Sequence, residues 1–320
     1  MGIYLEVLNN LDEQNKIQLV LSNFKYFNLS NITIEQYHDE EKGEDCSYDC
    51  AYNVYRITYN KEHFVLKKSN IDEILIYSKM LENNSFSVPR FYKNIKVDKT
   101  DWVLIEHVSG TDLREFNNEM AIATAHSISK IHNYYWQEDG FEDDKVDSRF
   151  CKYWKRINKR AECLKNEFYL SEAYQEFLNR QLICPRTLCN GDFLQQNAIF
   201  NDSKVTIIDW AFGGIMPYSL DISRLITHGN QNRFPFSYYM TDEYRKTFIN
   251  EYYLKLSQKP DYKQFIWDII LAALNECIEF IEKELNDKSI ERDKGFDFYY
   301  ETANKIADII MKGYDNFILI

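Results

Sequence analysis

The sequence has few glycines and prolines, an odd number of cysteines and a shortage of positive charge. Only 10 of its 320 residues are glycine and 5 are proline, which excludes collagen-like and Pro/Gly-rich disordered chains. Hydrophobic residues make up 45% and charged residues 28%, the proportions of an ordinary globular protein. Since a domain usually has roughly 100–200 residues, the length predicts two lobes or domains with a sizeable core.

The seven cysteines indicate neither a disulfide framework nor a zinc site. Their number is odd, and no C-x-x-C pair occurs. Cys46 and Cys50 are the closest pair, but they lie in a polar segment without a second pair to complete a metal site. Free thiols are typical of a reducing compartment, so we expect a cytoplasmic protein.

The charge balance and the hydropathy pattern argue against two classes of partner. The 38 basic and 50 acidic residues give a net charge of −12, which would repel a nucleic-acid backbone. No run of about 20 apolar residues occurs, and the first residues lack the pattern of a signal peptide, so we expect neither a membrane span nor secretion. The acidic field would attract a cationic substrate, although acidic surfaces also serve solubility. Nothing in the pattern indicates an oligomeric state.

The hydrophobic periodicity divides the chain into a strand-rich first part and a helical second part. The first part is expected to contain a helix at 12–24, a strand at 31–38, a hairpin at 53–59 and 63–68, a helix at 71–81 and a strand at 102–108. The second is expected to contain helices at 120–135, 150–180, 219–228, 241–257, 261–285 and 297–317, with a hairpin at 197–200 and 204–210. We therefore predict an α+β protein, with a mixed antiparallel-sheet domain at 1–108 and a mainly helical domain at 109–320.

The most informative segment is the loop and hairpin from residue 188 to residue 210. Four residues separate Asp192 from Asn197, and the hairpin returns the chain to Asp209 after an apolar run. Phosphoryl transfer needs a carboxylate that orients or deprotonates the attacking hydroxyl, and oxygen ligands for Mg²⁺. Because the short loop lets both its side chains face one pocket while the hairpin brings the third opposite them, these residues are candidates for such a site.

This segment resembles the aminoglycoside phosphotransferase and choline kinase superfamily. The family's loop typically reads His-Gly-Asp, then Asn and later Ile-Asp-Trp; this chain has NGD at 190–192, Asn197 and IDW at 208–210. The resemblance covers nearly the whole chain and implies a two-lobed, protein-kinase-like fold. It also implies transfer of the γ-phosphoryl group of Mg-ATP, with GTP as an alternative, to a hydroxyl of a small acceptor.

The resemblance implies roles for single residues. Asp192 would be the catalytic base, Asn197 and Asp209 would hold Mg²⁺, and Asp221 would support the loop from the following helix. The implied acceptors include aminoglycosides and amino alcohols such as choline, with amino acids, sugars and other hydroxylated metabolites also open. Acids on the helix at 261–285 are candidates to meet a cation, with solvent-facing positions as the alternative; they include Asp268, Glu276 and Glu279.

The first part of the chain contains a candidate phosphate anchor. Lys67 ends the strand FVLK and Glu73 lies in the next helix, an arrangement in which a lysine contacts the α- and β-phosphates while a helix acid orients it. Asp72 and Glu82 are alternative acids, and a first-turn acid also caps a helix. Lys68 points to the opposite strand face and is expected to face solvent.

The resemblance also implies a second contact to the nucleotide, at the adenine base. The strand VLIEHV resembles the family's linker, whose main-chain groups read the adenine edge, which implies backbone contacts from Glu106 and Val108. A plain buried strand is the alternative.

Two features depart from the family pattern. Asn190 replaces the family's histidine and can hydrogen-bond but cannot titrate near neutral pH. The phosphate-covering loop at 47–53 contains no glycine, which leaves both ATP and GTP open. These departures support a second hypothesis, a catalytically weak kinase-fold binding or scaffold protein similar to the spore-coat relatives. The intact catalytic aspartate, metal ligands and Lys67 favour the enzyme.

Overall fold

The computed structural model describes residues 3–24, 26–39, 51–82, 85–137 and 148–313. The chain divides into two compact units, Met1–Ser109 and Gly110–Ile320. None of the described helices has an apolar stretch long enough to cross a membrane.

The first unit is built on a six-stranded antiparallel sheet in the order β1-β2-β3-β4-β6-β5. Its elements are β1 (Ile3–Val7), α1 (Leu11–Ser22), β2 (Ile32–Asp39), β3 (Ala51–Tyr59), β4 (Glu62–Ser69), α2 (Ile71–Leu75) with a π-helical continuation (Ile76–Leu81), β5 (Phe91–Val97) and β6 (Thr100–Glu106). Helix α1 buries Ile17, Val20 and Leu21 in a core that includes Leu66 and Trp102 from the sheet.

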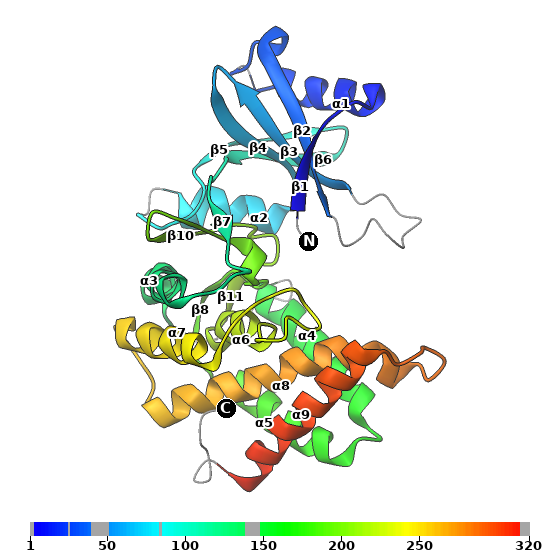
Figure 1. The fold of residues 1–320 in the computed structure, drawn as a ribbon, viewed down its shortest axis with the longest axis vertical. Coiled ribbons are helices and arrows are strands. Elements are labelled where there is room, and N and C mark those ends of the chain that lie inside the picture. The colour runs from blue at the N-terminus through cyan, green and yellow to red at the C-terminus, as the bar shows by residue number, and fades with distance from the viewer. Residues whose placement is uncertain (1–2, 25, 40–50, 83–84, 138–147, 314–320) are drawn as a thin grey trace. The chain divides into compact units, whose positions relative to one another are not determined.

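The two faces of the sheet carry different helices. Because strand side chains alternate, Leu66 faces α1 and Lys67 points to the opposite face. Helix α2 lies on that second face (Figure 1), where Glu73 contacts Lys67. Because side chains alternate between the two faces of β4, Lys67 is on the face that α2 covers and Leu66 is not.

The predicted hairpin is present, with its turn at Asn60 and Lys61. Both residues have positive φ angles, 52° and 68°, and Tyr59 pairs with Glu62. Two successive positive φ angles are the signature of tight turns that match the twist of antiparallel strands. The hairpin thereby fixes the register of β3 and β4, and so the position of Lys67.

The periodicity missed the two edge strands of this sheet, β1 and β5. The prediction that the chain opens on a helix was wrong, because β1 precedes α1. Both strands are exposed or half-buried along their length, so neither has a buried face to produce a regular apolar alternation. Their pairing depends on main-chain hydrogen bonds, which composition does not report.

The second unit is mainly helical. Its elements are β7 (Thr111–Asp112), α3 (Asn118–Tyr135), α4 (Arg149–Ala161), α5 (Phe168–Gln181), β8 (Arg186–Cys189), β9 (Ala198–Asn201), β10 (Lys204–Ile207), β11 (Gly214–Pro217), α6 (Ser219–Thr227), α7 (Asp242–Lys255), α8 (Tyr262–Asn286) and α9 (Lys294–Lys312). Helix α8 packs against α5, α6 and α9 (Figure 1), and 3₁₀ turns follow α4 and precede β9. The α+β class expected from the sequence is confirmed.

Several boundaries in this unit differ from the prediction. The expected helix at 150–180 is two helices, α4 and α5, and the antiparallel pair β8–β11 was missed because strands of four residues are too short to show a period. The last helix, expected at 297–317, is α9 and begins earlier, at Lys294, where Asp293 caps its N-terminus by accepting the Phe296 N–H at 2.7 Å.

Candidate active site

The loop after β8 is held by one buried carboxylate on α6. The main-chain N–H groups of Asn190 and Gly191 donate to the two oxygens of Asp221 at 2.7 and 2.9 Å. Asp221 is fully buried, and His132 of α3 lies behind it, with its Nε2 3.5 Å from Oδ2. The geometry is what the predicted supporting role of Asp221 requires, since two buried donors meet one buried acceptor.

His132, Cys189 and Asp221 also form a fully buried group of possible metal-ligand atoms, all within 4.8 Å of one another. Both oxygens of Asp221 already accept N–H groups from the loop. We therefore assign this group to the support of the loop and not to a metal.

Gly191 gives the loop a shape that other residues resist. Its φ angle is +79°, and a Cβ atom built on it would lie 2.2 Å from the carbonyl oxygen of Phe212. Left-handed backbone and close approach of another main chain are the two conditions that favour glycine. The segment after Asp209 thus packs directly on the backbone that precedes Asp192.

Asn190 ties the loop to the hairpin. Its side-chain amide donates to the carbonyl oxygens of Ile208 and Asp209 at 3.1 and 3.0 Å, and its Oδ1 accepts the Asp192 N–H at 3.2 Å. The residue is fully buried. The departure from the family's histidine therefore keeps a hydrogen-bonding link between the two halves of the candidate site.

Asp192 and Asn197 lie in direct contact, as the spacing predicts. The Asn197 amide nitrogen donates to the main-chain oxygen of Asp192 at 2.6 Å and to its Oδ2 at 3.1 Å. The side chain of Asp192 is 24% exposed, so its carboxylate can reach a small molecule. The 3₁₀ turn at Gln195–Asn197 folds the loop back and produces this contact.

Asp209 follows the hairpin in an unusual backbone conformation. Strand β10 ends at Ile207, three residues earlier than expected, and Asp209 has a φ angle of 54°. The Ile208 N–H donates to the Asn197 carbonyl oxygen at 2.9 Å, which joins the hairpin to the loop next to Asp209. Aspartate adopts left-handed φ angles more readily than most residues.

These side chains offer oxygen ligands that suit a hard divalent cation. Because the Asn197 amide nitrogen contacts Asp192, its amide oxygen is turned away from that carboxylate. Asp209 adds a half-buried carboxylate. Mg²⁺ typically binds through one or two carboxylates together with substrate phosphates, so the residues fit the expected ion.

Arg224 of α6 is a part of the site that the sequence analysis missed. Its Nη2 and Nε lie 2.8 and 3.1 Å from Asp192 Oδ1, and its Nη1 lies 2.7 Å from Glu276 Oε2. Burial opposes ionisation of Glu276, but Arg224 and His228 together outweigh it and lower the pKa of Glu276 to about 2. Both oxygens of Asp192 thus have partners, Arg224 on one and Asn197 on the other.

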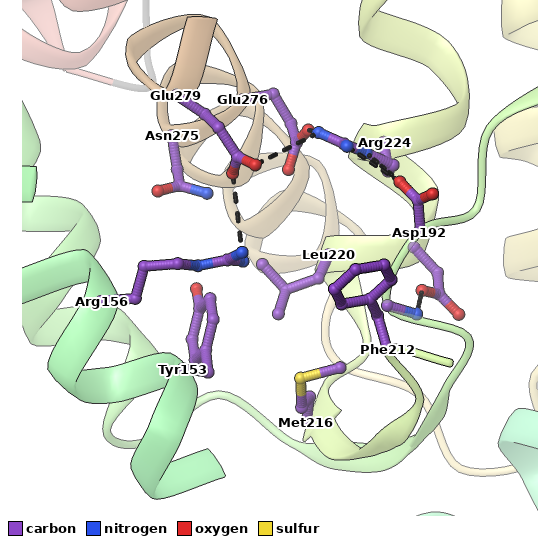
Figure 2. A pocket seen from close by; sticks show the side chains of 12 residues that line it. Tyr153, Arg156, Asp192, Phe212, Met216, Leu220, Arg224, Asn275, Glu276 and Glu279 are labelled. Atoms are coloured by element: carbon purple, nitrogen blue, oxygen red, sulfur yellow. Dashed lines mark hydrogen bonds and ion pairs between the residues drawn. The ribbon is translucent and has the colours of Figure 1, made fainter. Parts of the chain in front are cut away.

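Asp192 and Arg224 line a cavity of about 190 Å³ within the second unit. Figure 2 shows Tyr153 and Arg156 of α4 on one side and Asp192 and Phe212 on the other. The remaining lining comes from the loop after β8, from β11, from α6 and from α8: Gly191, Met216, Leu220, Asp221, Asn275, Glu276 and Glu279. The cavity combines the carboxylate of Asp192 with a wall of apolar and charged side chains.

Two of the three acids proposed on the helix at 261–285 reach this cavity. Glu276 and Glu279 line it. Asp268 is fully buried elsewhere, where its carboxylate accepts from Arg180, Tyr218 and Gln264. Asp268 therefore stabilises the packing of helices and is not a candidate for substrate contact.

In the first unit, Lys67 and Glu73 form an ion pair. Lys67 Nζ lies 2.9 Å from Glu73 Oε1, and the Glu73 side chain is 1% exposed. Ser69 Oγ donates to the other Glu73 oxygen at 2.6 Å, and Lys68 is exposed. Among the three acids considered from the sequence, Glu73 is the one in this pair.

The Glu106 main chain is only in part available to a ligand. Its N–H donates to the Arg90 carbonyl oxygen at 2.9 Å, and its carboxylate accepts the Arg90 N–H at 3.0 Å. Strand β6 ends at Glu106, so Val108 lies beyond the strand, where it is half-buried. An adenine contact at Glu106 is therefore restricted to its carbonyl oxygen.

Part of the expected nucleotide-covering loop lies outside the described residues. Positions 47–50 belong to that part, and Cys46 also lies outside the described residues. The described end of the loop, 51–53, is already strand β3.

Comparisons with known proteins concern the fold and the family of the chain. The chain matches no curated protein sequence. The amicoumacin kinase hAmiN, solved in complex with AMP-PNP, Ca²⁺ and Ami, is 12% identical with a TM-score of 0.57, and the match covers 98% of each chain. The choline kinase LicA from Streptococcus pneumoniae is 15% identical with a TM-score of 0.56, over 92% of this chain and 99% of that one. The Plasmodium vivax ethanolamine kinase Pv091845 is 15% identical with a TM-score of 0.52, over 97% and 83%.

At these identities the solved structures confirm the protein-kinase-like fold expected from the sequence. The model of the phosphotransferase enzyme family, APH, matches residues 51–262, which include Asp192, Asn197 and Asp209. Since this match covers more than half of the 320 residues, the chain belongs to the phosphotransferase enzyme family.

Proposed function

We propose that this protein transfers the γ-phosphoryl group of a Mg²⁺-bound nucleoside triphosphate, ATP or GTP, to a hydroxyl of a small acceptor. The observation that carries the proposal is the joined arrangement of Asp192, Asn197 and Asp209 beside a cavity that Asp192 lines. A carboxylate next to a metal-ligand pair is what phosphoryl transfer to an alcohol requires of a protein.

Asp192 is proposed to orient the acceptor hydroxyl and to take its proton. The new bond forms between the hydroxyl oxygen and the γ-phosphorus, while the bond from that phosphorus to the departing nucleoside diphosphate breaks. Arg224 contacts the carboxylate at Oδ1 and Asn197 contacts it at Oδ2, so the two contacts together fix its rotation. No covalent enzyme intermediate is required.

Asn197 and Asp209 are the proposed Mg²⁺ ligands. A bound Mg²⁺ would neutralise charge on the phosphates. We expect Asp209→Asn to raise the Mg²⁺ concentration needed for half-maximal nucleotide binding, since the change removes a ligand charge. Titration of a fluorescent nucleotide with Mg²⁺ measures this, with Asp202→Asn in the exposed hairpin turn as the matched control. Equal Mg²⁺ dependence in both variants would contradict the role of Asp209.

The proposed adenine contacts are the Glu106 carbonyl and the Val108 main chain.

Lys67 is the proposed contact to the α- and β-phosphates, and Glu73 is the partner that orients it. We expect Lys67→Met to weaken nucleotide binding by roughly 10- to 100-fold, the usual worth of a charged hydrogen bond. Lys68→Met removes the same charge from the neighbouring, exposed position and should leave binding unchanged. Equal affinities in both variants would exclude Lys67 as the anchor.

The deciding experiment is Mg²⁺-dependent release of ADP or GDP in the presence of a panel of hydroxylated acceptors. Acceptor-stimulated release that Asp209→Asn abolishes supports the proposal. Nucleotide binding without turnover of any acceptor would favour the catalytically weak binding protein, and no nucleotide binding at all would favour a scaffold.

A further inference from the structure

The carboxylates that face the cavity beside Asp192 are already paired with arginines. Glu276 lies 2.7 Å from Arg224, and Asp192 lies 2.8 Å from the same guanidinium. Glu279 lies 2.9 Å from Arg160, which is 1% exposed and stands behind the wall. An incoming ammonium group therefore finds each of these carboxylates already held by a guanidinium.

One guanidinium at the cavity differs from the others in its exposure. The side chain of Arg156 is 53% exposed, and its Nη2 lies 3.9 Å from Glu279, beyond hydrogen-bond distance. Arg160 and Arg224, by contrast, are 1% and 16% exposed and hold carboxylates at 2.9 Å or less. Figure 2 shows Arg156 pointing into the cavity from α4, on the side opposite Asp192. A guanidinium offers a planar fork of donors that fits the oxygens of a carboxylate or a phosphate.

The size of the cavity limits the acceptor. Its volume of about 190 Å³ is below the roughly 300 Å³ at which pockets for drug-sized ligands begin. Phe212, Met216 and Leu220 supply apolar wall, which suits a short carbon chain. A multi-ring amino sugar exceeds this volume, and a small molecule that spans from Arg156 to Asp192 fits it.

We propose that the acceptor is a small hydroxylated anion: its hydroxyl lies at Asp192, and its carboxylate or phosphate group is bound by Arg156. Arg156 is thus a specificity-determining residue of the second unit. The inference rests on the proposed phosphotransferase function and names its acceptor class. It differs from the cationic acceptor that the net charge would attract, because the carboxylates Asp192, Glu276 and Glu279 are each already held by an arginine.

The test compares acceptors that differ only in the anionic group. Acceptor-stimulated ADP release is measured with 4-hydroxybutyrate against 4-hydroxybutyramide and with glycerol 3-phosphate against glycerol, beside choline, ethanolamine and kanamycin. We expect an anion to stimulate release and its uncharged counterpart to fail; the first pair identifies a carboxylate and the second a phosphate. Turnover of choline, ethanolamine, kanamycin or a neutral polyol in preference to the anions overturns the proposal.

The matched variants are Arg156→Gln and Lys155→Gln, which remove one positive charge each from adjacent exposed positions of α4. Arg156→Gln should raise the KM for the anionic acceptor by roughly 10- to 100-fold with kcat retained, and Lys155→Gln should change neither. Equal KM values in the two variants overturn the role of Arg156.

A binding measurement separates this proposal from the function on which it rests. Calorimetry follows 4-hydroxybutyrate and glycerol 3-phosphate binding to the AMP-PNP-loaded protein. Binding that Arg156→Gln removes, in a protein that releases no ADP, supports the acceptor class and contradicts the phosphotransferase. Absence of anion binding to the wild-type protein overturns the acceptor class, whatever the activity.

Discussion

Replacing Asp192 with asparagine should lower kcat by about 10²- to 10⁴-fold, the range that a positioned general base contributes. Asparagine has nearly the same shape and can still contact Asn197, but it cannot take the proton of the acceptor hydroxyl. Arg224 keeps Glu276 as a partner in the variant, so no unpaired charge is left in the wall. Nucleotide affinity should be unchanged, because Asp192 is not among the proposed phosphate or metal contacts.

The matched control is Asp202→Asn, the same substitution in the exposed turn between β9 and β10. Asp202 has a φ angle of 48°, which asparagine also adopts readily, so the change should leave stability and kcat as they are. Rates are measured under saturating nucleotide and acceptor, beside melting curves of both variants. A kcat for Asp192→Asn equal to that of the control would remove Asp192 from the chemistry.

Gly191→Ala should strongly lower the free energy of unfolding. The φ angle of +79° costs an alanine about 1–3 kcal/mol, and the methyl group 2.2 Å from the Phe212 carbonyl oxygen adds about 1–3 kcal/mol of overpacking. The same displacement would move the main chain of Asp192, so we expect kcat to fall together with the free energy of unfolding.

Gly313→Ala separates the two causes. Gly313 has a φ angle of +78°, nearly that of Gly191, but no described atom lies within 4 Å of an added Cβ. Its loss in the free energy of unfolding, measured in urea, should be about 1–3 kcal/mol from the backbone alone. An equal decrease in the free energy of unfolding in both variants would mean that the contact with the Phe212 carbonyl oxygen adds no destabilisation at Gly191.

The sequence predicted those parts of the site that are close together in the chain. The loop and hairpin from 188 to 210 could be predicted because turn residues and short strands determine their geometry locally, and the Lys67–Glu73 pair spans six residues. Their chemical roles remain predictions. The two-part α+β fold could be predicted because buried helices and central strands carry a clear hydrophobic period.

The parts that escaped prediction depend on contacts between distant segments. Arg224 lies 32 residues after Asp192, and Glu276 lies 52 residues after Arg224, distances for which no spacing rule exists. The orientation of α4, which turns Arg156 toward the cavity, is set by tertiary packing that periodicity cannot specify. The edge strands β1 and β5 were missed because their side chains are exposed or half-buried, so their sequences show no regular apolar alternation.

Two of the contacts that hold the loop after β8 come from the same helix, α6. Asp221 holds the loop's main chain and Arg224 holds the Asp192 carboxylate, and these two residues are three positions apart on α6. Neighbours at that spacing lie on the same face of a helix, about one turn apart. A small displacement of α6 would therefore carry the backbone and the reactive carboxylate together as one rigid body. Motion of α6 would therefore keep the Asp192 carboxylate in place relative to the backbone of its own loop. It would change the distances from that carboxylate to groups on other helices and strands.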